Sequence, residues 1–433
     1  MKKIVIKNFR GFRHFEMDFT PGVTLLVGDN SSGKTSLLKA AKYALSSFFC
    51  GFSDENTQWQ SPTNEDFSKF ITDDWTTPLE PIEIGFTLYD DLFSINGISD
   101  KELLVRKNSP KNCRTLVGGL VPLRDLGQSL KEKMYSTENG KCIRKLPLPL
   151  FDSISTVYTH VDKKINKRKF LSLSPVPSLG YLGCLTGGGL ATHWWQRIKV
   201  LAETNKRLWE INGIQSTINR SLGPTGCNII DSIKPIISLN EIFINCVDGT
   251  IITYNLLPDG YLRLIDIVVN LAFRCLLLNG EMYGEEAPLY TKGVVLIDEI
   301  DLHLHPSLQA LVVEGLTKAF PNLQFIITTH APRVMSGLEN SSKDQVVIIQ
   351  KESDGLISRQ SFQTFGLDVN SILELLGISI RDSGTQKELE ELFQLVDDGK
   401  NEEARKKIKE LRTRYGDTLP DITEAETLLT INS

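Results

Sequence analysis

Eight residues near the start of the chain have the types and the spacing that bind phosphate groups. The pattern G-x-x-x-x-G-K-[ST] is matched without a mismatch by Gly28, Asp29, Asn30, Ser31, Ser32, Gly33, Lys34 and Thr35, and Ser36 follows it. Glycines allow close backbone approach, so successive N–H groups and a helix N-terminus can surround an anion. In such a loop the lysine reaches the β- and γ-phosphates and the threonine hydroxyl binds Mg²⁺. The loop therefore predicts a nucleoside triphosphate site, and a chance match is disfavoured by the strand and helix expected around it.

A second set of candidate site residues follows two apolar runs late in the chain. Asp298 ends the run 294–297, and a carboxylate at the end of a buried strand completes a Mg²⁺ site. Glu299 comes next and is suited to orient or deprotonate an attacking water, with a surface ion pair as the alternative. His330 follows the second run and a pair of threonines, a position that favours a functional role over a structural or capping one.

The elements that must position these residues are predicted by hydrophobic patterns. β-Branched or continuous apolar runs predict strands at 4–9, 23–27, 294–297, 324–328 and 346–349. The continuous runs are typical of strands buried on both faces of a parallel sheet. Apolar spacing at 36–49 predicts a helix opened by the phosphate loop. Residues 242–254 predict a β-hairpin with a two-residue turn at Asp248 and Gly249, followed by a long helix.

Changes of pattern along the chain suggest four segments. We expect an N-terminal part of a nucleotide-binding head at 1–50, a β flank and divergent helical insertion at 51–240, the rest of the head at 241–380, and a helical tail for partner binding or self-association at 381–433. Within the insertion, Trp194 and Trp195 belong to an apolar stripe at helical spacing. A packing role is favoured for them over nucleobase stacking.

Composition excludes several classes of protein. The 433 residues carry 48 Lys and Arg against 53 Asp and Glu, and no apolar run approaches the length that spans a bilayer. Seven scattered cysteines without a C-x-x-C pair are typical of reduced thiols, so we expect a soluble, cytoplasmic protein. The acidic balance argues against a surface that binds DNA everywhere, so DNA contact would be local or indirect.

Four motifs together resemble the ABC-type ATPases of the RecF and SMC group. They are Phe9-Arg10-Gly11-Phe12, the phosphate loop, the segment 296–306 from Leu296 to Pro306, and the segment 327–332 from Ile327 to Pro332. The resemblance implies an α/β fold, a P-loop NTPase head with a mixed or parallel sheet, flanking helices and an antiparallel β flank. It further implies that two heads sandwich ATP, that Asp301 begins the dimer-facing D-loop and that His330 senses the γ-phosphate. Arg10 would lie beside the adenine, with a plain strand-end arginine as an equal alternative.

The signature segment departs from the pattern of that family. In place of Leu-Ser-x-Gly, the chain has Leu257, Pro258, Asp259 and Gly260. The family's serine donates to the γ-phosphate bound on the opposite subunit, whereas proline has neither a hydroxyl nor an N–H. The amide of Gly260 and the following helix N-terminus can still meet an anion. We therefore expect heads that bind ATP and hydrolyse it slowly or not at all.

The segment 365–373 and the tail resemble the PtuA ATPases of Septu and retron-linked anti-phage systems, and the resemblance covers about 1–47 and 241–429. In those systems the ATPase multimerises and restrains a separate HNH nuclease until infection. The resemblance implies a homo-oligomeric regulatory subunit that uses ATP and Mg²⁺ and has an HNH nuclease as its partner. Two alternatives stay open: a PARIS-type scaffold that releases a Toprim-like effector, and a RecF-like DNA-repair ATPase.

Overall fold

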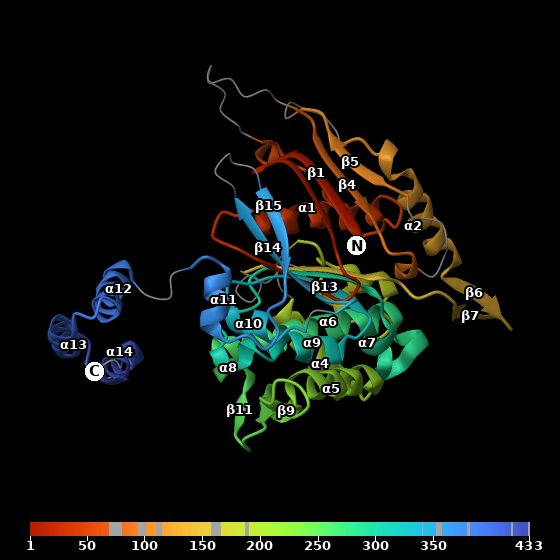
Figure 1. Ribbon diagram of the computed structural model, residues 1–433. Helices are drawn as coiled ribbons and strands as arrows, with labels where there is room; N and C mark the ends of the chain where they lie inside the picture. Colours follow the sequence, from red (N-terminus) through yellow and green to blue (C-terminus); the bar gives the residue numbers. More distant parts are fainter. Residues whose placement is uncertain are drawn as a thin grey trace. The chain divides into compact units, whose positions relative to one another are not determined.

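The central sheet is built from apolar strands that are buried on both faces. In the computed structural model its strands follow the order β15-β14-β3-β13-β12-β8 (Figure 1). Their bounds are β3 Val23–Val27, β8 Leu150–Ile154, β12 Gly293–Ile297, β13 Leu323–Thr328, β14 Gln345–Lys351 and β15 Ile357–Phe362. Only β15 pairs antiparallel, with β14, and the other neighbours pair parallel. Every residue of β3, β12 and β13 is buried, which confirms the expected parallel sheet.

The chain divides into two units, Met1–Leu367 and Asp368–Ser433. The structure describes residues 1–68, 80–93, 101–109, 115–156, 166–186, 190–339, 341–351, 357–378, 382–416 and 419–431. Among these described residues, no helix combines the length and the apolar character needed to cross a membrane. The central sheet belongs to the first unit.

A four-stranded antiparallel sheet flanks the central sheet. It has the order β2-β1-β4-β5 and is formed by β1 Lys3–Phe9, β2 Phe12–Asp18, β4 Ile82–Thr87 and β5 Leu103–Lys107. Helix α1, Lys34–Ser46, packs against β1 and β4 of this flank and against β13 of the central sheet. The α/β fold with an antiparallel β flank is therefore confirmed, and it fixes α1 between two sheets (Figure 1).

A third sheet and several helices lie on the opposite side of the central sheet (Figure 1). The sheet has the order β11-β10-β9, with β9 Ile230–Ile236, β10 Glu241–Cys246 and β11 Ile251–Thr253. The hairpin is confirmed, but its expected two-residue turn is wrong. The amide of Cys246 donates to the carbonyl of Thr250, which leaves a three-residue loop with Gly249 at φ +85°. A glycine at positive φ closing a three-residue loop is the next commonest hairpin geometry.

The remaining elements of the first unit are mostly helices. They are α2 Val121–Lys133, α3 Lys167–Phe170, α4 Ala191–Thr204, α5 Leu208–Leu222, α6 Asp259–Tyr283, α7 Ala287–Tyr290, α8 Pro306–Gln309, α9 Val312–Ala319 and α10 Pro332–Ser336, together with a separate hairpin of β6 Tyr135–Glu138 and β7 Lys141–Arg144. Helix α6 is the long helix expected after the hairpin. Trp194 and Trp195 of α4 are buried, which confirms their packing role. Strand β8 shows that the segment assigned to flank and insertion also contributes to the central sheet.

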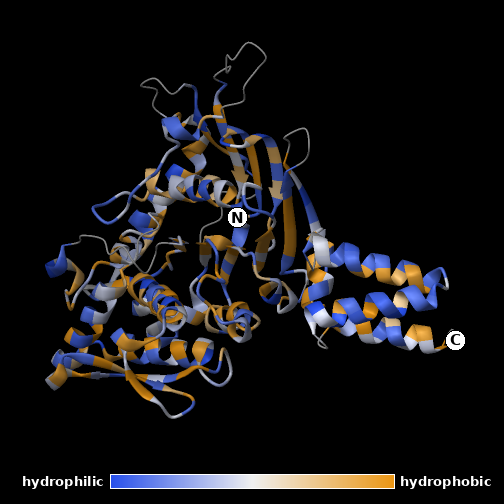
Figure 2. Ribbon diagram, turned by 90° about the vertical axis from the view of Figure 1, so that its left-hand side faces the viewer, coloured by the Kyte–Doolittle hydropathy of each residue, from blue (hydrophilic) through white to orange (hydrophobic). Residues whose placement is uncertain are grey.

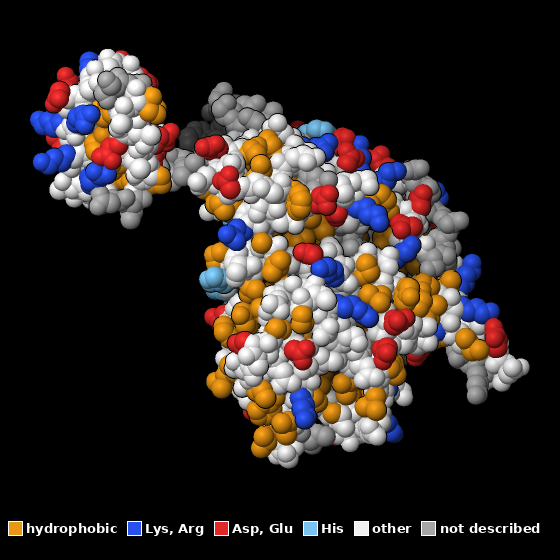
Figure 3. Space-filling model, turned by 60° about the horizontal axis from the view of Figure 1, so that its bottom comes forward, with side chains coloured by type: hydrophobic (Ala, Val, Ile, Leu, Met, Phe, Trp, Pro, Cys, Tyr) orange, Lys and Arg blue, Asp and Glu red, His pale blue; other side chains and the backbone are white. Residues whose placement is uncertain are grey.

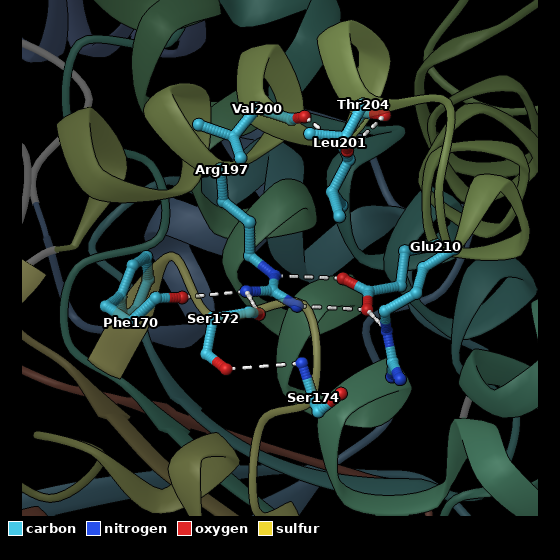
Figure 4. Close-up of polar contacts among 9 residues, drawn as sticks. Phe170, Ser172, Ser174, Arg197, Val200, Leu201, Thr204 and Glu210 are labelled. Atoms are coloured by element: carbon cyan, nitrogen blue, oxygen red, sulfur yellow. Dashed lines mark hydrogen bonds and ion pairs between the residues drawn. The ribbon is translucent and has the colours of Figure 1, made fainter. Parts of the chain in front are cut away.

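A buried ion pair joins α4 to α5 (Figure 4). The guanidinium of Arg197 donates twice to the carboxylate of Glu210, at 2.9 and 3.0 Å, and both side chains are almost fully buried. Arg197 also donates to the carbonyls of Phe170 and Ser172 at 2.7 and 3.0 Å. Arg207 donates a further bond to Glu210. The Arg197–Glu210 pair therefore holds α4 and α5 together, and the guanidinium also holds the segment of Phe170 and Ser172.

We expect the substitution Glu210→Gln to lower the free energy of unfolding by about 3 kcal/mol or more, because it leaves the buried charge of Arg197 without its partner. Urea denaturation followed by circular dichroism measures this loss. The matched control is Glu314→Gln, which breaks the exposed pair with Lys318 and should cost at most about 0.5 kcal/mol. Equal stability of the two variants would contradict the role assigned to the buried pair.

The described residues of the second unit form four helices. Their bounds are α11 Val369–Leu375, α12 Ser383–Asp397, α13 Asn401–Tyr415 and α14 Pro420–Ile431. The last three bury a shared apolar core of Leu389, Leu392, Val396, Ala404, Ile408, Leu411, Ile422, Ala425 and Leu429. Figure 2 shows these helices with apolar and polar faces, as expected for a small bundle. The unit begins at Asp368, before the position 381 at which a helical tail was expected.

Candidate functional site

The phosphate loop connects the buried strand β3 to α1. Gly28 and Gly33 adopt φ values of +145° and +101°, which only glycine adopts readily. A Cβ atom on Gly28 would lie 2.1 Å from the carbonyl oxygen of Ile349, so no side chain fits there. No side chain caps the N-terminus of α1. The loop therefore leaves the first N–H groups of α1 without a side-chain acceptor, at the helix end that favours an anion.

Lys34 lies folded against its own loop. Its Nζ donates to the carbonyls of Gly28 and Asp29 at 2.7 and 2.8 Å, and it lies 3.4 Å from the hydroxyl of Ser32. Burial lowers the pKa of this ammonium group, while nearby carboxylates oppose the shift. A phosphate oxygen would offer the buried cation a charged acceptor, which makes a stronger hydrogen bond than a carbonyl.

The acidic turn after β12 meets the phosphate loop at the carboxyl edge of the central sheet. The hydroxyls of Thr35 and Thr328 both contact Oδ1 of Asp298, at 3.3 and 2.7 Å. The backbone N–H of Glu299 donates to the hydroxyl of Thr328 at 2.8 Å. Glu299 has φ +50°, an uncommon conformation for a residue with a side chain. Folding thus brings together residues that lie far apart in the sequence.

A pocket of about 180 Å³ opens at this edge. It is lined by Asn30, Ser31, Gly33, Lys34, Thr35, Ser36, Asp298, Glu299, Thr328 and His330. All of these except Thr328 were sequence candidates. The candidates that do not line the pocket are Arg10, Gly28, Asp29, Ser32, Pro258, Asp259, Gly260 and Asp301. Sequence reasoning noted the threonines before His330 without assigning them a role, and that polar pair at the end of a buried strand was the available signal.

Arg10 contacts a buried carboxylate that sequence reasoning missed. Asp66 is fully buried. Its oxygens accept from Arg10 Nε at 3.0 Å, Lys39 Nζ at 2.7 Å, Tyr43 Oη at 2.8 Å, and both the amide and the hydroxyl of Thr63 at 2.9 Å. Burial alone would raise the pKa of Asp66, but these hydrogen bonds outweigh burial and lower it below its usual range. Asp66 thereby connects the β1–β2 turn with α1.

A lowered pKa in the folded state means that ionised Asp66 stabilises the fold above its unfolded pKa of about 4, and that this contribution is lost as pH falls. We expect Asp66→Asn to destabilise the protein most at neutral pH, and its deficit relative to wild type to shrink towards pH 3. Urea titrations at several pH values measure this difference. Asp125→Asn, at an exposed surface pair, is the control. A deficit independent of pH would contradict the assignment.

The signature segment lies at the start of α6. Pro258 occupies the N-cap position with φ −58° and ψ 145°, and no side chain caps the helix there. Pro258 and Asp259 are exposed, whereas Gly260 is buried against the backbone of His303. Arg263, one turn further, donates to the carbonyls of Asp298 and Glu299, each at 3.0 Å. The segment therefore stands apart from the pocket of its own chain, while its helix is tied to the acidic turn.

Asp301 lies beside the end of β13. Its Oδ1 accepts from the hydroxyl of Thr329 at 2.5 Å and from the backbone N–H of His330 at 3.3 Å. The hydroxyl of Thr329 accepts in turn from the amide of Ala331 at 3.0 Å. Asp301 therefore fixes the backbone of the segment that carries His330.

The pocket suits Mg²⁺ only together with a phosphate ligand. Within the described part of the chain, no group of three or more His, Cys, Asp or Glu side chains could hold a metal ion. Thr35 and Asp298 supply two oxygen ligands next to the cationic Lys34. Mg²⁺ typically takes one or two protein ligands and completes its shell with phosphate oxygens and water. The residues present fit such a metal–nucleotide complex.

Two family models match the sequence. Residues 3–172 match a model described as an AAA domain, and residues 210–336 match one described as an AAA domain, putative AbiEii toxin, Type IV TA system. Each matched segment is therefore similar to an AAA domain. The first match contains the phosphate loop, and the second contains the acidic turn and His330. Together the two ATPase matches include every residue that lines the pocket.

Parts of the chain are also similar to named ATPases and to a DNA-repair protein. The retron Vc95 probable ATPase of Vibrio cholerae is 41% identical over 104 residues, which are 24% of this chain and 19% of that protein. The Septu protein PtuA of Bacillus mycoides is 31% identical over 163 residues, 36% of this chain and 22% of that protein. The DNA replication and repair protein RecF of Listeria welshimeri is 28% identical over 105 residues, 24% of this chain and 28% of that protein. The resemblance to PtuA, retron and RecF ATPases is confirmed.

The matches span about a fifth of the length of the retron and PtuA relatives. Among solved structures, an SMC head bound to the C-winged helix domain of ScpA aligns with a TM-score of 0.44 and 17% identity, over 84% of this chain and 98% of that one.

Proposed function

We propose that this chain is the ATP-binding regulatory subunit of an anti-phage defence complex. The observation that carries the proposal is the convergence of Lys34, Thr35, Asp298, Glu299 and His330 on one pocket at the carboxyl edge of the sheet. The similarity to the Septu protein PtuA and to retron ATPases supports the biological setting. Isothermal titration of the protein with ATP and Mg²⁺ tests the binding function, and an absence of saturable binding would refute it.

Five residues of the pocket have assigned tasks in this proposal. Lys34 turns its ammonium group from the loop carbonyls to the β- and γ-phosphates, and the free N–H groups of α1 bind phosphate oxygens. Thr35 and Asp298 hold Mg²⁺, which when bound neutralises the phosphate charge. Glu299 orients the attacking water, and the imidazole of His330 lies beside the γ-phosphate. Arg10, held by Asp66 in the antiparallel flank, would lie beside the adenine.

Two copies complete the site in this proposal. Pro258 and Asp259 are exposed at the N-terminus of α6 and do not line the pocket of their own chain. The same segment of a second copy would present that helix end, with the amide of Gly260, to the γ-phosphate. Because ATP would then bind the dimer and not the separate heads, nucleotide stabilises assembly by mass action. Light scattering with and without ATP and Mg²⁺ tests this point, and a mass that ATP leaves unchanged would refute it.

We expect hydrolysis to be slow because Pro258 supplies no hydroxyl to the γ-phosphate. The substitution Glu299→Gln should then change the lifetime of bound nucleotide by less than about threefold, because little of that lifetime is set by chemistry. Release of a fluorescent ATP analogue, chased with unlabelled ATP, measures the lifetime. A large increase from a short wild-type lifetime would show that Glu299 already supports fast turnover.

The proposed partner is a separate HNH nuclease, which the ATP-bound assembly restrains until infection. Co-purification with the product of the neighbouring gene, with and without ATP and Mg²⁺, tests this step. We expect ATP to strengthen the complex and to lower nuclease output. The proposal fails if ATP changes neither quantity, and a Toprim-like neighbour would instead favour the PARIS-type scaffold.

The similarity to RecF favours one second candidate, an ATPase that binds duplex DNA directly. Figure 3 shows one face on which basic and acidic side chains are interspersed, without a broad basic area. Direct binding predicts an affinity for DNA that falls steeply with salt, since each neutralised phosphate releases counterions. Fluorescence anisotropy of the protein alone, at several salt concentrations, decides between the two candidates.

A further inference from the structure

Thr328 ends β13 at a point where its hydroxyl reaches two consecutive residues of the acidic turn. The hydroxyl donates to Oδ1 of Asp298 at 2.7 Å and accepts from the N–H of Glu299 at 2.8 Å. Its own carbonyl accepts from the amide of Ile300 at 3.1 Å. The residue is fully buried, so bulk water cannot take over these bonds. One threonine therefore fixes three successive residues of the turn.

The turn needs this support because its backbone conformation is costly. Glu299 has φ +50°, and a residue with a side chain adopts that region only where its surroundings hold it there. Arg263 holds the turn from the other side, through the carbonyls of Asp298 and Glu299. Of the two supports, only Thr328 also touches the carboxylate proposed to bind metal. Losing its hydroxyl would free the rotation of Asp298 and loosen the turn together.

We propose that Thr328 is a positioning residue that makes nucleotide binding depend on Mg²⁺. This inference rests on the proposed function and adds a residue to the proposed site. The hydroxyl of Thr328 orients Asp298 towards the metal and Glu299 towards the pocket. The adjacent Thr329 donates to a different carboxylate, that of Asp301, so mutation can separate the roles of the two threonines. The hydrogen bonds of Lys34 go to residues of its own loop and not to Thr328, so metal-free binding of phosphate should survive the loss of Thr328.

The test measures the affinity of the full chain for a fluorescent ATP analogue in Mg²⁺ and in EDTA. We expect Thr328→Val to keep the affinity in EDTA and to lose about tenfold in Mg²⁺, the effect of one hydrogen bond to a charged group. Thr328→Ser, which keeps the hydroxyl, should restore the dependence on Mg²⁺. In an Asp298→Asn background, Thr328→Val should have no further effect, because the two changes remove one interaction.

The control is Thr217→Val, which removes a buried hydroxyl from α5 that donates to the carbonyl of Gly213. It should leave both affinities unchanged. The inference is overturned if Thr328→Val keeps the full Mg²⁺ effect or weakens both affinities equally, since a merely structural role gives the latter. If the valine variant does not fold, Thr328→Ala is measured with the same two outcomes. A wild type that binds no nucleotide refutes the proposed function itself, whereas a wild type that binds equally in Mg²⁺ and EDTA refutes only this inference.

Discussion

The substitution Lys34→Ala is expected to abolish ATP binding almost completely. Lys34 is the cation of the pocket that is buried among loop carbonyls, and its Nζ already makes two short hydrogen bonds there. Replacing those acceptors with phosphate oxygens provides charge-assisted bonds, each worth about 1.5 to 3 kcal/mol. Losing two of them should weaken binding by about a hundredfold or more. Isothermal titration in Mg²⁺ measures the loss directly.

The control for this experiment is Lys42→Ala, which removes a lysine from the same helix, two turns beyond the loop. It should bind ATP as wild type does. Thermal unfolding of each variant without nucleotide separates a binding defect from a folding defect. Addition of ATP should raise the melting temperature of wild type and Lys42→Ala, and leave that of Lys34→Ala unchanged. An ATP-induced shift in the Lys34 variant would contradict the assignment of the phosphate loop.

The substitution Pro258→Ser is expected to accelerate ATP hydrolysis by about tenfold or more, because one hydroxyl donor to a developing charge contributes at least this much. Position 258 is the exposed N-cap of α6, with backbone angles that serine adopts readily. Serine is also among the preferred N-cap residues, so the variant should fold at least as stably as wild type. Phosphate release at saturating ATP measures turnover, and Glu299→Gln in the serine background should then stop it.

Pro258→Ala separates the effect of the added hydroxyl on turnover from the effect of removing the proline ring. Alanine frees the backbone in the same way but offers no donor, so its turnover should equal that of wild type. The acceleration should also depend on protein concentration, because the proposed hydroxyl acts on a nucleotide held by a second copy. Equal rates for the serine and alanine variants, or a gain independent of concentration, would argue against contact across a dimer.

Local patterns predicted much of the fold because each predicted element carries its own periodicity. The continuous apolar runs at β12 and β13 predicted buried parallel strands. The phosphate loop after β3 and the apolar spacing beyond it predicted helix α1. Asp298, Glu299 and His330 were found because each lies within two residues of the end of such a run. They share one pocket because the carboxyl ends of parallel strands meet at one edge of the sheet.

The roles of two residues, Asp66 and Thr328, were not predicted because they depend on contacts between distant segments of the chain. Asp66 lies in a polar loop that has no motif, and only folding places it against Arg10 and α1. Thr328 was noted only as one of two threonines before His330, and its bonds to Asp298 and Glu299 depend on the folded chain. The predicted hairpin loop was one residue too short. Asp-Gly occurs both in two-residue turns and in three-residue loops, and strand register decides which of the two forms.

The position of β3 has a consequence for how this protein is made. β3 lies between β13 and β14, so both of its neighbours come from residues 323–351, roughly three hundred residues later in the chain. Synthesis on the ribosome proceeds at about 5 to 20 residues per second, so β13 and β14 are made many seconds after β3 and the phosphate loop. The nascent N-terminal segment meanwhile carries an apolar strand with open edges, which invites aggregation. Chaperone capture of the growing chain should therefore last until the end of β14 has emerged.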